Sequence, residues 1–224
     1  EDLGMYFQGA FEQHRRRDCM VVACQAGISV NGYFADSSYA FRKRQHVHEI
    51  AFHTVTASFP SAVSYEFLRL KESFPALVFD CVPLPVAYCR ALSGVLKGKE
   101  LFVIDIACDR TSLFVVREYA IGAFSSFAHS DEKDRERWNI LFSQTLDDFF
   151  PAGGIPANVC VFGENQDIRL SSDFISRSLS DFSHEKTFTI NRMRGSSFFG
   201  GESFHGALGE GDAPLAALLY YAVE

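Results

Sequence analysis

The sequence is poor in basic residues relative to acidic ones, and this excludes one large class of partner. Its 21 Lys and Arg are outnumbered by 28 Asp and Glu, which gives a net charge of −7. Nucleic-acid binding needs clustered positive charge to neutralise phosphates, so we expect no nucleic-acid partner. The one basic cluster, residues 14–17, is interpreted as a solvated approach to the first strand, with a charge contact to a membrane surface or an acidic partner as the alternative.

The chain also lacks closely spaced cysteine pairs, long apolar runs and a signal-peptide pattern. None of its six cysteines forms a C-x-x-C pair, and most lie in apolar runs, so we expect buried free thiols in a reducing compartment. No apolar run reaches the roughly 20 residues that a membrane helix needs. The sequence therefore predicts a cytoplasmic protein.

The length and hydrophobic content of the chain are sufficient for one large domain or two small lobes. The chain has 224 residues, of which 47% are hydrophobic, and 23 are phenylalanine. The hydrophobic share is ordinary for a folded chain with a sizeable core, whereas the phenylalanines are unusually many. Residues 6–9 resemble the remnant of an engineered protease site, so residues 1–17 are treated as an N-terminal tail outside the fold.

Residues 101–128 organise the rest of the prediction. An apolar run ends on Asp105, a tight turn follows, and two further β-rich runs read as a meander. An aspartate at the end of a buried strand, followed by a turn with backbone N–H groups and hydroxyls, is a plausible place for a metal-bound phosphate.

This stretch resembles the second phosphate loop of the actin-like ATPase superfamily, which includes actin, heat-shock chaperone ATPases and sugar kinases. In that superfamily a strand ends in Asp, and a small-residue turn and a Thr or Ser follow. The resemblance implies that Asp105 holds Mg²⁺ through water and that Asp109, Thr111 and Ser112 contact phosphates. Residues 74–92 match the segment before this loop in the PilM/FtsA-like branch of bacterial cytoplasmic proteins.

The resemblance implies a duplicated α/β fold of the actin-like (ribonuclease H-like) kind, with two lobes and mixed sheets. Residues 18–98 would form the first lobe, which is trimmed, and residues 99–224 the second. In the first lobe we expect strands at 20–24, 28–35 and 39–42, with a turn at 25–27, as a second copy of the meander.

Two other segments that contact the nucleotide in the superfamily differ from the family pattern in this sequence. In the first loop Gly27 is kept and Asn31 takes a polar position, but Gln25 replaces an acid and cannot offer Mg²⁺ a charged oxygen. An ordinary hairpin is the alternative interpretation of that segment. Beneath the adenosine Gly163 is kept, but Glu164 replaces a second glycine and would crowd a phosphate.

The remaining pattern predicts alternating helices and strands. If they lie on a strand, His46 and His48 would share a face, but two ligands do not make a zinc site, and we expect no metal site. Residues 49–57 are expected to form a strand. Trp138 is expected in the core. We expect helices at 60–73, 83–93, 130–150, 171–179 and 215–222, and further strands at 76–82, 157–163 and 186–191.

Three functions are compatible with these motifs. The first is a non-enzymatic actin-like scaffold with protein partners, such as a membrane-associated assembly or a homodimer, and with no catalytic residues and no cofactor. The second is an ATP-binding protein or weak ATPase that uses ATP and Mg²⁺. The third is a small-molecule kinase or another enzyme of the same superfamily, for which Asp80 and His129 are isolated candidates. The degenerate loops favour the first.

Overall fold

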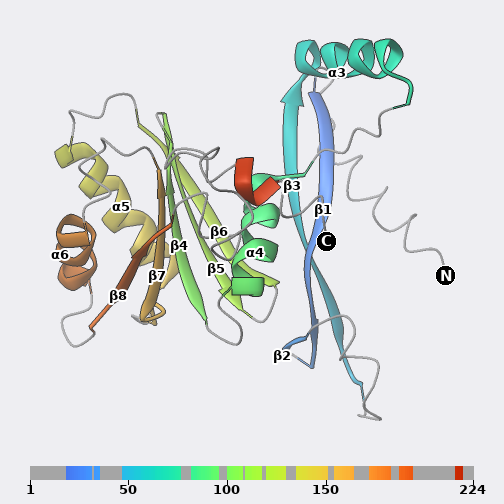
Figure 1. Cartoon of the computed structure of the whole chain (residues 1–224). Coiled ribbons are helices and arrows are strands. Elements are labelled where there is room, and N and C mark those ends of the chain that lie inside the picture. Colours follow the sequence, from blue (N-terminus) through green and yellow to red (C-terminus); the bar gives the residue numbers. More distant parts are fainter. Residues whose placement is uncertain are drawn as a thin grey trace.

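Two β-sheets, placed side by side with a helix between them, form the framework of the chain (Figure 1). The computed structural model describes residues 19–31, 33–35, 47–76, 82–95, 100–107, 109–117, 120–129, 135–150, 154–163, 172–182, 187–193 and 215–218. The expected strand at 39–42 and Glu164 lie outside the described residues. So do most of the expected strand at 76–82 and half of the expected last helix.

Within the described residues the larger sheet has five strands, in the order β6-β5-β4-β7-β8. β4, β5 and β6 form the antiparallel meander expected from the sequence, and β7 and β8 run parallel to β4. β4 is buried on both faces because strands flank it and helices cover it. The strands span Leu101–Ile106 (β4), Arg110–Arg117 (β5), Ala120–Ala128 (β6), Asn158–Gly163 (β7) and Thr189–Arg192 (β8).

One face of this sheet is covered by α5 (Arg135–Phe149) and α6 (Ser172–Phe182) (Figure 1). The apolar face of α5 is turned toward the sheet and is fully buried, as the sequence predicts. Its members recur at the helical period: Trp138, Phe142 and Leu146. The Trp138 ring stacks on Phe142 with 4.7 Å between ring centroids. The expectation that Trp138 is a core residue is therefore confirmed.

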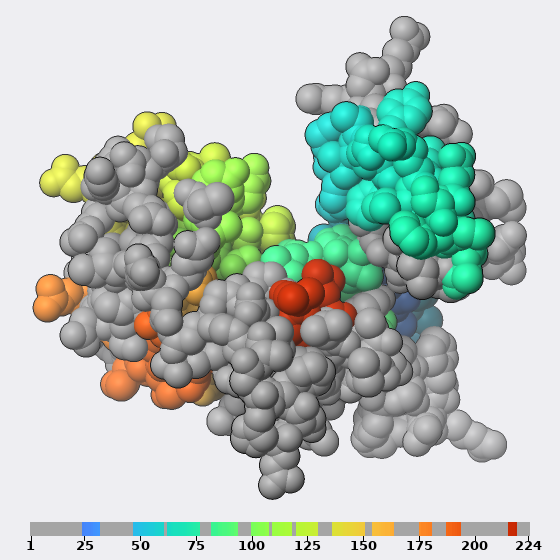
Figure 2. Space-filling model, turned by 45° about the horizontal axis from the view of Figure 1, so that its top comes forward, coloured from blue at the N-terminus to red at the C-terminus, as the bar shows by residue number. Residues whose placement is uncertain are grey.

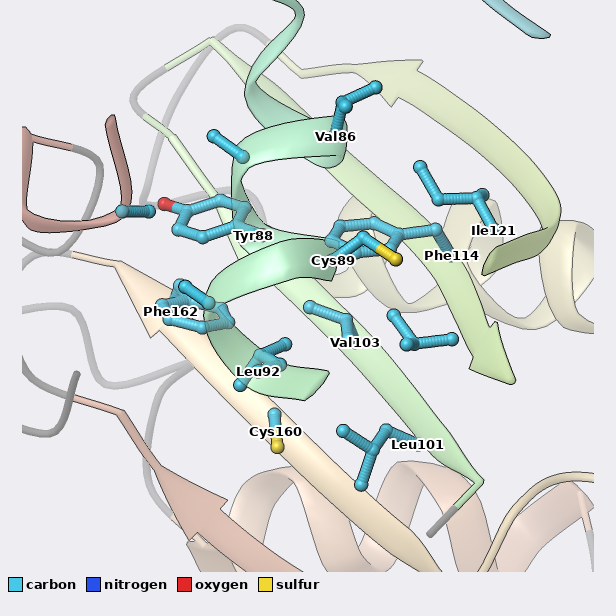
Figure 3. Close-up of a cluster of buried hydrophobic side chains, with 14 of the residues drawn as sticks. Val86, Tyr88, Cys89, Leu92, Leu101, Val103, Phe114, Ile121, Cys160 and Phe162 are labelled. Atoms are coloured by element: carbon cyan, nitrogen blue, oxygen red, sulfur yellow. The ribbon is translucent and has the colours of Figure 1, made fainter. Parts of the chain in front are cut away.

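The opposite face is covered by α4 (Leu84–Val95), which begins after Pro83 as expected for a proline-led helix. Figure 3 shows its side chains Val86, Tyr88, Cys89 and Leu92 among apolar residues of β4, β5 and β7. α4 also contacts β1 of the smaller sheet. This helix, assigned to the first lobe by the sequence, therefore packs in a core that both sheets share, and the lobe boundary after residue 98 stays a prediction.

The smaller sheet contains β1 (Cys19–Val30), β2 (Tyr33–Ala35) and β3 (Ile50–Pro60) in the order β2-β1-β3. All of its described pairs are antiparallel. β1 is central, so the described strands of the first half do not repeat the meander of the second half.

Two details of the first half differ from expectation. The turn predicted at 25–27 is wrong, because β1 continues through it and accommodates one extra residue as a bulge between Gln25 and Gly27. The strand predicted at 28–35 is interrupted at Asn31, which adopts a positive φ of 52°. Asn31 Oδ1 accepts hydrogen bonds from the backbone N–H groups of His48 and Glu49 at 2.9 and 3.1 Å, so this side chain fixes the start of β3.

α3 (Ser61–Ser73) follows β3 directly and matches the helix expected at 60–73. It lies across the ends of β1 and β3, away from the larger sheet (Figure 1). Its apolar stripe, at positions i, i+4, i+7 and i+11, is exposed to solvent rather than packed in a core: Val63, Phe67, Leu70 and Phe74. No helix in the described part of the chain is long and apolar enough to span a bilayer.

Candidate functional site

Asp105 lies near the carboxyl end of β4, on the face of the sheet that α4 covers. It pairs with Ser112 of β5 on one side and with Phe162 of β7 on the other. Its carboxyl group is largely buried, and this burial raises its pKa from 3.8 to about 6. The carboxylate is therefore held where ionisation is costly unless a cation or a hydrogen-bond donor compensates it.

Tyr88 of α4 is the residue of this site that the sequence did not indicate. Its ring stacks on Phe162 with centroids 4.2 Å apart, and Figure 3 shows the two rings together beneath α4. Burial, and secondarily the charge of Asp105, raise the pKa of Tyr88 far above its ordinary value. The helical period of α4 indicates which face Tyr88 occupies, but only the packing of α4 on β4 and β7 brings it to Asp105.

Gly163 ends β7 beside Ile106, the last residue of β4. Its φ of 153° lies in a region that side-chain-bearing residues rarely adopt. Because β4 and β7 are parallel, their carboxyl ends share one edge of the sheet, which is where open α/β sheets bind ligands. Asp105, Ser112 and Gly163 therefore lie together at the edge where a ligand is expected.

The hairpin after Asp105 is tightly closed. The Ala107 N–H donates to the Arg110 carbonyl at 2.9 Å, and the Asp109 carbonyl accepts the His129 N–H at 2.9 Å. Asp109 itself is exposed at the tip, whereas His129 is buried. The Ala107 N–H is thus committed to the turn and is not offered to a phosphate.

The side chain of Thr111 and the backbone of Gly27 do not join this group. Thr111 is fully buried on the opposite face of the sheet, where its hydroxyl oxygen accepts a hydrogen bond of 2.8 Å from the Trp138 indole. Gly27 lies in β1 against Ala120, the first residue of β6. Ala120 pairs with Arg117, at the end of the sheet where β4 begins, and lies roughly 16 Å from Asp105 along the strand direction.

Only a limited metal site is compatible with these residues. The described part of the chain contains no group of three or more His, Cys, Asp or Glu that could hold an ion. Mg²⁺, however, commonly keeps several waters and uses one or two carboxylates together with substrate phosphates. Asp105 fits that lesser role.

Known structures share the fold of this chain, although comparison by sequence finds no relative: no protein-family model and no curated protein matches the chain. A chain of a "PilM-PilN type IV pilus biogenesis complex" matches 98% of this chain and 74% of its own length, with a TM-score of 0.61 and 14% identity. The chain has an actin-like fold. This confirms the predicted fold class and its likeness to the PilM-like branch at the level of the fold.

Two other solved structures are similar to this actin-like chain at lower TM-scores. A Bacteroides thetaiotaomicron protein with an actin-like ATPase fold and unknown function has a TM-score of 0.47 and 10% identity, over 96% of this chain and 65% of that one. An activator of 2-hydroxyisocaproyl-CoA dehydratase from Clostridium difficile, with bound ADPNP, has a TM-score of 0.37 and 8% identity. The match covers 91% of this chain and 97% of the activator chain.

Proposed function

We propose that this chain is a non-enzymatic actin-like scaffold that acts through protein–protein contacts, similar to cytoplasmic components of pilus-assembly or secretion machinery. The observation that carries the proposal is the dispersal of the residues expected at a nucleotide. Asp105, Ser112 and Gly163 share one edge of the larger sheet, while Thr111 lies on the other face and Gly27 at the other end. Phosphoryl transfer depends on convergent groups that position and neutralise phosphates, and this dispersal argues against it.

The proposed partners are other proteins, in a membrane-associated assembly on the cytoplasmic side of the inner membrane. The similarity in fold to a chain of a PilM-PilN type IV pilus biogenesis complex supports this choice. The exposed apolar side chains of α3 support it as well, because contiguous exposed apolar surface is typical of protein interaction sites.

The alternative is an ATP-binding protein or weak ATPase, and one observation favours it. The pKa of Asp105 is about 6 in the absence of a cation, so bound Mg²⁺ would favour the ionised form and gain from it. In this alternative ATP and Mg²⁺ are the cofactors, with Asp105, Ser112 and Gly163 at the nucleotide and Asp109 at the tip of the adjoining hairpin.

Thermal unfolding with and without Mg²⁺-ATP separates the two functions. A ligand at about 100 times its dissociation constant stabilises a protein by about 2.7 kcal/mol. For a chain of this size that corresponds to a rise in Tm of about 5–10 °C. The scaffold proposal predicts no shift with about 1 mM nucleotide, at which a site of about 10 µM affinity would be saturated.

Two matched variants assign any shift to a site. Asp105→Asn removes the buried carboxylate, and Asp147→Asn removes an exposed one from α5. A shift in the wild type that disappears in Asp105→Asn and persists in Asp147→Asn would replace the scaffold proposal with the ATP-binding alternative.

A further inference from the structure

β6 is an edge strand of the larger sheet in the part of the chain that the structure describes. β5 pairs with one side of it, and no described strand pairs with the other. Figure 1 shows it as the outermost strand on the side of the smaller sheet. Natural edge strands are usually protected by charged side chains, proline or short length. β6 has nine residues, and none of them is Lys, Arg, Asp, Glu or Pro.

The start of β6 is covered, and the rest is open. Ala120 lies against Gly27 of β1 and is buried. An extra residue, Gly122, forms a bulge that separates this start from residues 123–128. Those residues are exposed or half-buried, and 45% of Phe124 is exposed. Figure 2 shows the molecule hollowed between the larger sheet and the block formed by β3 and α3, so this part of β6 faces solvent.

A guanidinium group lies at the open part of the strand. Arg110 of β5 pairs with Ala128, and its Nη1 donates a hydrogen bond of 3.0 Å to the hydroxyl oxygen of Ser126. This bond uses one of the five N–H donors of the guanidinium. Because neighbouring strands lie about 4.8 Å apart, a carboxylate on a strand added beside β6 would be within reach of the guanidinium. We call residues 123–128 together with Arg110 the β6 edge.

The exposed aromatic ring and the guanidinium lie on one face of the sheet. Phe124 pairs with Phe114, whose side chain is in the core beneath α4, and Ser126 pairs with Ser112. Side chains on one face recur at every second residue, so Arg110 shares this face with Ser112. A strand paired with β6 would therefore present one residue to Phe124 and another, two positions away, to Arg110.

The charge of the β6 edge indicates which kind of strand fits it. A second copy of β6 has no acidic residue to offer, so two paired copies would bring no carboxylate to either Arg110. A strand that carries Asp or Glu supplies that carboxylate, and Arg–carboxylate hydrogen bonds are among the strong ones in proteins. An apolar residue two positions from the acid would cover Phe124.

We propose that the β6 edge is a docking surface for an extended acidic segment of another protein, which adds a strand to the larger sheet and places an Asp or Glu against Arg110. This inference rests on the scaffold function proposed above and names the chemistry of the partner. Main-chain hydrogen bonds to β6 supply affinity in this mode of binding, and alternate side chains supply specificity.

Fluorescence anisotropy with two labelled peptides, STVTETVTS and STVTKTVTS, tests the proposal on the full chain. The peptides differ only in the central residue, and each has valines two positions from it on both sides, so either strand direction fits. The wild type is expected to bind the glutamate peptide about tenfold more tightly than the lysine peptide. Raising the salt concentration should reduce this difference.

Three variants assign the binding to the β6 edge. Arg110→Gln should weaken binding of the glutamate peptide about tenfold and leave the lysine peptide no weaker. Phe124→Ser removes the exposed ring and should weaken both peptides. Arg177→Gln alters an exposed arginine of α6 and should change neither. Circular dichroism of each variant checks that the fold is retained.

Amide hydrogen exchange tests the strand pairing itself. With the glutamate peptide bound, exchange should slow within residues 123–128, because open backbone groups of β6 become paired. A wild type that binds neither peptide or does not prefer the glutamate peptide, binding that is unchanged in Arg110→Gln, or protection confined to residues outside β6 would each overturn the proposal. Nucleotide titration tests the scaffold function separately, so a chain that binds neither peptide nor Mg²⁺-ATP would lose this docking surface and keep the scaffold function.

Discussion

Gly27 offers a direct test of how the two sheets are joined. A methyl group at this position would overlap the side chain of Ala120 and would lie 3.0 Å from the Ala120 Cα. Carbon atoms in contact normally lie about 3.5–4.0 Å apart, and the Ala120 methyl group is nearer still than its Cα, so β1 and β6 would have to separate by more than about 1 Å. The φ of Gly27 is outside the left-handed region, so the whole cost comes from packing.

Overpacking of this kind typically costs about 1–3 kcal/mol. We expect Gly27→Ala to lower the free energy of unfolding by that amount in urea denaturation. Ala120→Gly removes the methyl group that faces Gly27. The double variant Gly27→Ala/Ala120→Gly should therefore lose less free energy of unfolding than the two single variants lose together, by at least about 1 kcal/mol. A Gly27→Ala chain within about 0.5 kcal/mol of the wild type, or strictly additive losses, would refute the close approach of β1 to β6.

Three further predictions concern the larger sheet. Asp105 ionises near 3.8 when unfolded and near 6 when folded, so the folded state binds more protons between these values and stability should fall by about 3 kcal/mol as pH rises through them. Asp105→Asn should abolish this loss of stability. If the wild type and Asp105→Asn gave parallel curves of stability against pH, the prediction would be wrong. Gly163→Ala should destabilise by about 1–3 kcal/mol because of its backbone conformation, whereas Gly154→Ala, where a methyl group meets open space, should be neutral in the same urea series. Thr111→Val leaves the buried Trp138 N–H without its acceptor and should cost about 1–3 kcal/mol, while a neutral Thr111→Val would show that the bond is not made.

The larger sheet could be predicted from the sequence because its signals are local. The apolar run of β4, the polar turns around β5 and the helical period of α5 each specify an element without distant information. The same signals failed in the first half. Gln25 to Gly27 resembles a turn, but pairing with β3 keeps β1 extended there, with one bulged residue. Long-range pairing overrode the local preference.

The candidate site was predicted only in part, for a reason of strand geometry. Asp105 and Thr111 are near each other in sequence, but side chains alternate between the faces of a sheet. Asp105 pairs with Ser112 and therefore shares a face with it, whereas Thr111 pairs with Ile106 and faces α5. The hairpin register decides this, and the motif alone does not reveal it. Likewise, the apolar stripe of α3 predicts a helix but not whether that stripe meets a core or a partner.

Calorimetric titration of the full chain with ATP and with ADP in the presence of Mg²⁺ tests the scaffold proposal most directly. If the dispersal of Thr111 and Gly27 from Asp105 has removed the nucleotide site, no heat of binding should appear up to millimolar nucleotide. Binding with a micromolar dissociation constant, lost in Asp105→Asn, would contradict the proposal and show that the edge formed by Asp105, Ser112 and Gly163 suffices to hold the phosphates.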